Sequence, residues 1–135
     1  MDNINNLICF LIALQSFCKD IHYNAKGDAF YSKHLLVDRV QENISDYIDR
    51  IKEVCILGNN EQTLPSWEYL SAATGLIPEP AESDLDNFRN LAALITSVLS
   101  LIEQMEGSQG ELNLYASIAE DLQNSLGLVN RQIIE

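Results

Sequence analysis

Residues 22–53 read HYNAKGDAFYSKHLLVDRVQENISDYIDRIKE, and this stretch decides the fold. Five residues within it could bind a metal, and they include both histidines of the chain: His22, His34, Asp38, Asp49 and Glu53. Positions 34 and 38 are four apart, as are 49 and 53, so each of these pairs shares one face of a helix. Imidazole and carboxylate ligands in this mixture are typical of non-haem iron.

The hydrophobic pattern on either side predicts helices throughout. A first amphipathic helix runs from about Asn3 to about Tyr23, because apolar residues recur at positions 4, 7, 8, 11, 14, 17, 18 and 21. A second begins near Asp28, a suitable N-cap, and runs to about Leu57, where a glycine and two asparagines end it. Its predicted buried stripe is Phe30, Val37, Val40, Ile44, Tyr47, Ile48, Ile51, Val54 and Cys55.

A long connection over residues 59–82 separates the second helix from two more. Within it, residues 65–73 predict a short helix. Ser83 caps a third long helix that Gly107 ends, and an S-x-x-E capping box at Ser108 begins the fourth. The predicted core face of the third helix is Phe88, Leu91, Ala92, Ile95, Val98, Leu99, Ile102 and Met105, and that of the fourth is Leu112, Tyr115, Ile118, Leu122, Leu126, Val129 and Ile133.

Four long helices, two short connections and one long middle crossover describe an all-α, ferritin-like four-helix bundle, with a short helix in the crossover between helices 2 and 3. A plain up-and-down bundle is the alternative, because periodicity alone does not separate the two. At 135 residues the chain is expected to form a single domain, residues 1–135, that buries a real core. We expect Trp67 of the crossover to be a packing anchor.

The charge balance is strongly acidic, with 20 acids against 8 bases and a net charge of −12. From Glu53 onward only Arg89 and Arg131 oppose 13 acids, so this part alone carries −11. Such a field repels nucleic acid and anionic membranes and concentrates cations. It could equally serve only to keep the protein soluble.

Three cysteines without paired spacing, Cys9, Cys18 and Cys55, indicate reduced thiols and a cytoplasmic protein. We expect them to be buried small hydrophobes. The apolar stretch 7–14 lacks the basic flank of a signal peptide and is too short to span a bilayer. Neither secretion nor a membrane partner is expected.

The eleven-residue gap between Asp38 and Asp49 bears on assembly. Eleven residues make very nearly three helical turns, so the four candidate ligands of the second helix face the same way. Along the axis, however, Asp38 and Asp49 lie about 16 Å apart, at roughly 1.5 Å per residue, too far to share one metal. The chain therefore carries two half-sites, the histidine half-site (His22, His34 and Asp38) and the acidic half-site (Asp49 and Glu53).

A twofold axis can join the two half-sites. If two copies of the second helix cross antiparallel near residues 43 and 44, the histidine half-site of one chain faces the acidic half-site of the other. His22, at the end of the first helix, reaches the His34 half-site from the same chain. The spacing thus predicts two equivalent sites per dimer and none that is complete in a monomer.

At these residues the sequence resembles the Dps family, the miniature ferritins of bacteria. The segment HYNAKGDAF at 22–30, followed by His34, Asp38, Asp49 and Glu53, resembles that family's intersubunit ferroxidase signature at every metal position. The general layout is similar over nearly the whole chain, including the short helix in the crossover. The third and fourth helices are similar only in pattern.

The resemblance implies a hollow, dodecameric shell that oxidises iron(II), preferentially with hydrogen peroxide, and stores ferric mineral inside, which protects against oxidative stress. It implies iron ligands His22, His34 and Asp38 from one chain and Asp49 and Glu53 from its partner, around one or two iron ions. Two alternatives are a helical assembly or interaction protein without turnover, and a DNA-compacting protein, which the acidic charge disfavours.

Two departures from the family pattern matter. The family usually has tryptophan where this chain has Tyr23; we expect a core aromatic there, although Tyr23 could pack beside the site, donate a hydrogen bond or accept an oxidising equivalent. Many members bind DNA through lysine-rich tails, whereas here the first lysine is Lys19 and the arm before it carries only Asp2. Because such binding needs clustered cations, we expect little or no binding of nucleic acid.

Acids of the fourth helix, Glu111, Glu120 and Asp121, could line an iron-entry pore in such a shell, or could simply be solvated. A bacterioferritin-type centre would instead use Glu-x-x-His motifs within one bundle. No such motif occurs, and the third and fourth helices contain no histidine.

Overall fold

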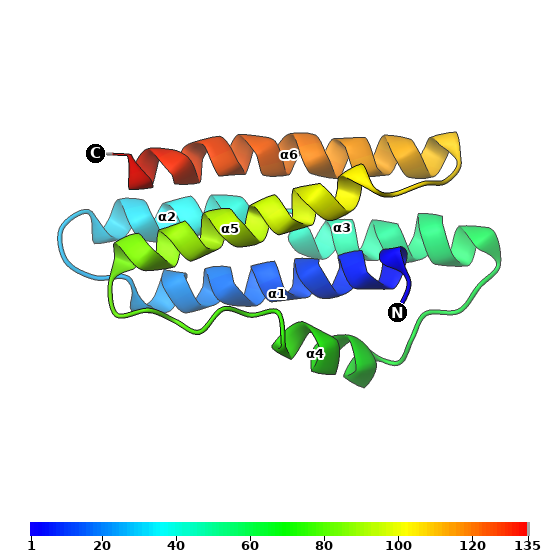
Figure 1. Cartoon of the computed structure of the whole chain (residues 1–135), viewed down its shortest axis with the longest axis horizontal. Coiled ribbons are helices and arrows are strands. Elements are labelled where there is room, and N and C mark those ends of the chain that lie inside the picture. The colour runs from blue at the N-terminus through cyan, green and yellow to red at the C-terminus, as the bar shows by residue number, and fades with distance from the viewer. Residues whose placement is uncertain (135) are drawn as a thin grey trace.

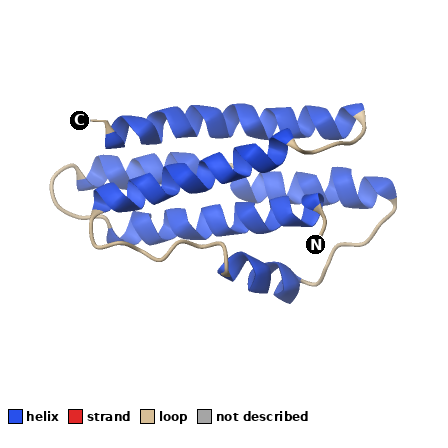
Figure 2. Ribbon diagram, viewed as in Figure 1, coloured by secondary structure: helices blue, strands red, loops and turns tan. Residues whose placement is uncertain are grey.

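The computed structural model describes residues 1–134, and every regular element among them is helical (Figures 1 and 2). The long helical rods are α1 (Asn3–Asn24), α2 (Phe30–Gln41) with α3 (Ile44–Ile51), α5 (Asp84–Glu103) and α6 (Gln109–Ile133). A π-helical turn, η1 (Lys52–Ile56), and a 3₁₀ turn, η2 (Leu57–Asn59), continue α3. The short helix α4 (Ser66–Thr74) lies in the crossover, as predicted.

The crossover decides the topology. Short loops join α1 to α2 and α5 to α6, whereas residues 60–83 return along the whole bundle from the end of η2 to the start of α5 (Figure 1). Helix α4 packs against α1 within this connection. The rod formed by α2 and α3 therefore runs in the same direction as α5, which is the ferritin-like arrangement and not the plain up-and-down one.

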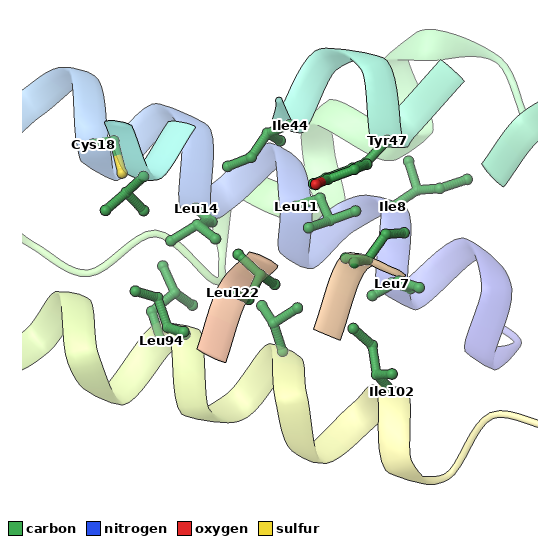
Figure 3. Close-up of a cluster of buried hydrophobic side chains, with 14 of the residues drawn as sticks. Leu7, Ile8, Leu11, Leu14, Cys18, Ile44, Tyr47, Leu94, Ile102 and Leu122 are labelled. Carbon is green, nitrogen blue, oxygen red and sulfur yellow. The ribbon is translucent and has the colours of Figure 1, made fainter. Parts of the chain in front are cut away.

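The core lies between the four rods, where apolar side chains from all of them interdigitate (Figure 3). The labelled members are Leu7, Ile8, Leu11, Leu14 and Cys18 from α1, Ile44 and Tyr47 from α3, Leu94 and Ile102 from α5, and Leu122 from α6. Each large aliphatic side chain buried in this way contributes about 1.5–3 kcal/mol relative to its exposed state. Burial of the stripes predicted from the sequence thus supplies most of what holds the rods together.

Helix α1 is long and apolar enough to cross a membrane by length and composition, with a mean hydropathy of 1.3 over 18 residues. Half of that window is buried inside the bundle, where α1 packs against α2, α4 and α5. The apolar stretch 7–14 is therefore part of a 22-residue core helix, and burial against its own chain explains its hydropathy.

The second rod is not the single helix predicted from Asp28 to Leu57. It begins after Ala29, which has a left-handed backbone (φ 61°) and provides no side-chain cap, so the prediction of Asp28 as N-cap is wrong. The rod breaks at residues 42 and 43, where Asn43 leaves helical geometry with φ −103° and ψ 2°. Sequence periodicity missed this break because the apolar stripe continues across it.

Three side chains predicted to be buried are exposed instead. Phe30 and Leu112 lie in the first turns of α2 and α6, at the ends of the bundle, and are 40% and 46% exposed. Val54, 40% exposed, lies in the π-helical turn, where the wider spiral changes the phase of the stripe and turns this residue outward. The remaining predicted core positions are buried or partly buried.

Trp67 is not the predicted packing anchor, because it is 68% exposed. Tyr69 takes that role in α4. It is 2% exposed, and its hydroxyl donates a hydrogen bond of 2.7 Å to Asn5 Oδ1 on α1. The same hydroxyl accepts from the backbone N–H of Leu64, which ties the start of the crossover to the bundle.

Candidate metal centre

The structure brings three of the five predicted residues together. His22 lies in the last turn of α1, and His34 and Asp38 lie one turn apart on α2. A ring nitrogen of each histidine and a carboxylate oxygen of Asp38 all lie within 4.8 Å of one another, and all three side chains are partly buried. A single cation placed among these atoms could be bound by all three.

A backbone carbonyl orients the ring of His34. Its Nδ1 lies 2.9 Å from the carbonyl oxygen of His22, and the two imidazole rings stack with centroids 3.6 Å apart. Because a carbonyl oxygen only accepts, Nδ1 donates the hydrogen bond, and the neutral ring keeps a lone pair on Nε2. Metal-binding histidines are commonly oriented through their second nitrogen in this way.

His22 presents the second nitrogen of the site. Its Nδ1 lies 3.0 Å from Asp38 Oδ1, close enough for an ion pair if the ring is protonated. The angle between Nδ1 and this oxygen is nevertheless poor for a hydrogen bond, and the buried Nδ1 has no hydrogen-bond partner among residues 1–134. Buried polar atoms are nearly always paired, so the donor set fits a cation that would bind His22 and Asp38 together.

Aromatic side chains surround the two imidazoles. The expectation that Tyr23 is a core residue is wrong, because it is 72% exposed. It packs beside the site instead, with its ring edge-on to His22 at 4.8 Å. Phe30 and Tyr31 flank His34, with ring centroids at 5.3 Å and 6.2 Å. One face of the site is therefore apolar and partly open to solvent.

The acidic half-site lies apart from this cluster. Asp49 is on α3 and Glu53 is in the π-helical turn η1; both are exposed, and neither belongs to the group that converges on His22. Neither carboxylate forms a hydrogen bond or ion pair within the described residues. The break at residues 42 and 43 separates them from the histidine half-site, and a complete shared site stays a prediction.

An ion pair that the sequence did not predict anchors the start of α2. Lys33 Nζ lies 2.9 Å from Asp84 Oδ2 of α5, and the same carboxylate oxygen accepts from the backbone N–H of Lys26 at 3.2 Å. Burial alone would raise the pKa of Asp84, but these bonds outweigh it and hold the pKa below its usual range. The turn of α2 that carries His34 is thus fixed to the bundle.

The acids of α6 are neither uniformly solvated nor arranged alike. Glu111 is only 7% exposed and closes the predicted capping box, with its N–H bonded to the hydroxyl of Ser108. The backbone N–H of Ser108 holds the pKa of Glu111 below its usual range. Asp121 is half-buried in an ion pair with Arg39, whereas Glu120 is exposed. A pore role for Glu111 is therefore wrong.

The three cysteines are free and buried, as expected. Burial raises the pKa of the Cys18 and Cys55 thiols, so they are held as neutral thiols. Packing explains them without a catalytic role.

Comparison with solved structures agrees with this architecture. The X-ray structure of Dps from Thermosynechococcus elongatus matches with a TM-score of 0.88 over 98% of this chain and 88% of that chain, at 16% sequence identity. The chain has a Dps-like, ferritin-like fold. Comparisons with protein families and with curated proteins found no match. At this identity the likeness shows the fold alone, and the chemistry has to be argued from the residues.

Proposed function

We propose that the protein is a ferroxidase and iron-storage protein whose sites are shared between two copies of the chain. One observation carries the proposal: the buried Nδ1 of His22 has no hydrogen-bond partner in the described part of the chain, although it lies 3.0 Å from Asp38 Oδ1 and beside the oriented ring of His34. Two imidazoles and one carboxylate leave room for further oxygen ligands on iron. The exposed Asp49 and Glu53 of a second copy would supply them.

Exposed apolar side chains support the same antiparallel pairing. In the antiparallel pairing, position 34 faces position 53 of the partner and position 38 faces position 49. Each pair of numbers adds up to 87, so other facing positions are found by the same sum. Under that twofold relation Phe30 lies opposite the partner subunit's Leu57, and these side chains are 40% and 58% exposed. Position 33 faces Val54 of the partner subunit in the same way. Tyr31, which is 65% exposed, lies within one helical turn of that position. Such apolar groups around both half-sites indicate an interface.

The reaction is simple to balance. One hydrogen peroxide molecule takes one electron from each of two iron(II) ions and, with two protons, becomes two water molecules. The carboxylates of the site hold both oxidation states of iron, and the histidines limit the ligand set. The aromatic face of Tyr23, Phe30 and Tyr31 would limit the access of water once a partner covers it.

The surrounding charge suits this role. A net charge of −12 attracts iron(II) to the protein and disfavours DNA, whose binding needs clustered lysine or arginine. We extend the proposal to a dodecameric, cytoplasmic shell that stores the ferric product and removes peroxide, because the fold is Dps-like and the three thiols are free and buried. Hydrogen peroxide and iron(II) are then its substrates.

The test combines activity with assembled mass. Iron(II) and hydrogen peroxide are added to the purified protein, and the near-ultraviolet absorbance of the ferric product is followed. Light scattering on the same sample gives the mass. We expect oxidation well above the protein-free rate in an assembly with twofold interfaces, and the same rate in a control with the exposed acid Glu103 replaced, Glu103→Gln. A monomer that oxidises iron at full rate would refute the shared site.

A further inference from the structure

A polar network spans the break in the second rod. Arg39, Asn43 and Tyr47 follow one another four residues apart, before, at and after the break. All three bond to the carboxylate of a single residue of α6. Asp121 Oδ1 accepts from Arg39 at 3.0 Å, and Oδ2 accepts from Tyr47 at 2.6 Å and from Asn43 at 3.4 Å.

Two members of the network are withdrawn from solvent. Tyr47 is 8% exposed and the side chain of Asp121 is 15% exposed, whereas the Arg39 side chain is 36% exposed and Asn43 is exposed. Hydrogen bonds to an ionised carboxylate are stronger than neutral ones, and the short bond from Tyr47 is of this kind.

The residues of the network adjoin the candidate iron ligands. Arg39 follows Asp38 directly in sequence, and Tyr47 precedes Asp49 by two residues. One of these anchors therefore lies beside the histidine half-site and the other beside the acidic half-site. A continuous helix would fix the relation between the half-sites by itself, but at the break Asn43 departs from helical dihedrals, so this relation also depends on contacts outside the rod.

We propose that Asp121 is a positioning residue that fixes the angle between α2 and α3, and hence the placement of the two half-sites relative to each other. The inference rests on the proposed shared site. In a twofold dimer the angle between α2 and α3 is the same in both chains. A change in this angle would therefore move the acidic ligands of each chain away from the histidine ligands of the other. Asp121 itself touches no iron ligand in this role.

The experiment uses cobalt(II), which has the charge of iron(II), does not turn over with air and reports its ligand geometry in the visible spectrum. Assembled wild-type protein and Asp121→Asn are titrated with cobalt(II), and mass and thermal unfolding are measured on the same samples. We expect Asp121→Asn to lose about tenfold in cobalt(II) affinity, the lower end of what supporting residues contribute to metal sites. We also expect an altered visible spectrum at saturation and an unchanged mass.

Two further variants make the result decisive. Tyr47→Phe removes one bond of the network and keeps the ion pair, so it should lose less, about threefold. Glu103→Gln removes one exposed charge elsewhere and should bind cobalt(II) like the wild type. If Asp121→Asn fails to fold or assemble, Tyr47→Phe replaces it as the test.

The outcomes separate the two proposals. A wild-type assembly that binds no cobalt(II) would refute the proposed metal site itself. A wild-type assembly that binds it, together with variants of unchanged affinity and spectrum, would refute the positioning role and leave the metal site standing. A loss of thermal stability without any change in cobalt(II) binding would also refute the positioning role, because the network would then contribute to stability alone.

Discussion

The two halves of the second rod differ in how far one chain prepares them. In α2, His34 and Asp38 meet His22 of α1 within a few ångströms, partly buried, with one ring oriented by a backbone carbonyl. In α3 and η1, Asp49 and Glu53 are exposed and have no side-chain partner within residues 1–134. One chain thus brings both proposed nitrogen ligands together with Asp38, whereas the proposed oxygen ligands Asp49 and Glu53 stay exposed on its surface.

The strongest test of this contrast mixes two inactive chains. His34→Ala and Glu53→Ala should each reduce iron oxidation by about a hundredfold, because each removes a proposed ligand from every site. After co-refolding of equal amounts, half of the twofold dimers contain one chain of each kind. One site of each such dimer is intact, so about a quarter of the wild-type activity should return.

The control for this experiment is a mixture of His34→Ala with Asp38→Ala. Both changes lie in the same half-site, so no dimer of these chains contains an intact site and activity should stay low. Equal recovery in both mixtures would contradict the division into two half-sites.

The interface should be sensitive at the acidic end of the rod. Leu57→Asp places a charge on a side chain that is 58% exposed in one chain but faces an aromatic group in the proposed dimer. We expect a fall in assembled mass at micromolar concentration, because burying an unpaired carboxylate is costly. Analytical ultracentrifugation measures this. The matched change Leu128→Asp, on the exposed surface of α6, should leave the mass unaltered.

A stability effect of intermediate size is expected where α5 turns into α6, close to the end of the acidic half. A Cβ at Gly107 would lie 3.0 Å from both the carboxyl carbon and Oε2 of Glu111. Gly107→Ala should therefore lower the free energy of unfolding by about 1–3 kcal/mol, the usual cost of crowding a packed site.

Gly110 provides the comparison within the same turn. Its Cβ would meet nothing nearer than 4.0 Å, and alanine is the better helix former by about 1 kcal/mol. Gly110→Ala should thus be neutral or stabilising in denaturant unfolding. A similar loss in both variants would mean that the contact with Glu111 is not the cause.

The smallest effect concerns acid. Asp84 and Asp121 hold the second rod at its start and at its break, and Glu111 closes the capping box of α6. The pKa values of all three lie below the usual 3.8 for Asp and 4.5 for Glu. A depressed native pKa adds stability above the unfolded value, and this stability disappears as the pH falls through the native one. Unfolding by urea between pH 6 and 3 should show this decline, and a shallower one in Asp84→Asn.

The sequence predicted the four rods, the crossover helix and the convergence of His22, His34 and Asp38, because all of these follow from local periodicity and spacing. It did not predict the break at Asn43, since the buried residues Val40, Ile44 and Tyr47 keep helical spacing across it. Nor did it predict the contacts of Arg39 with Asp121, which are 82 residues apart. Such long-range polar pairs leave no periodic trace in the sequence.

The π-helical turn beside Glu53 has a consequence for how the chain can change in evolution. A π-turn closes hydrogen bonds over one residue more than an α-turn, so η1 is equivalent to an α-helix with one inserted residue. If the exposed Val54 were removed, the buried Cys55 would follow the buried Ile51 by three positions and the buried Ile56 would follow it by four. This is the ordinary spacing of an α-helical stripe. The extra residue thus lies on the surface, next to the proposed ligand Glu53. Its deletion in a related sequence would change the direction of the Glu53 side chain and leave the packing of the core intact.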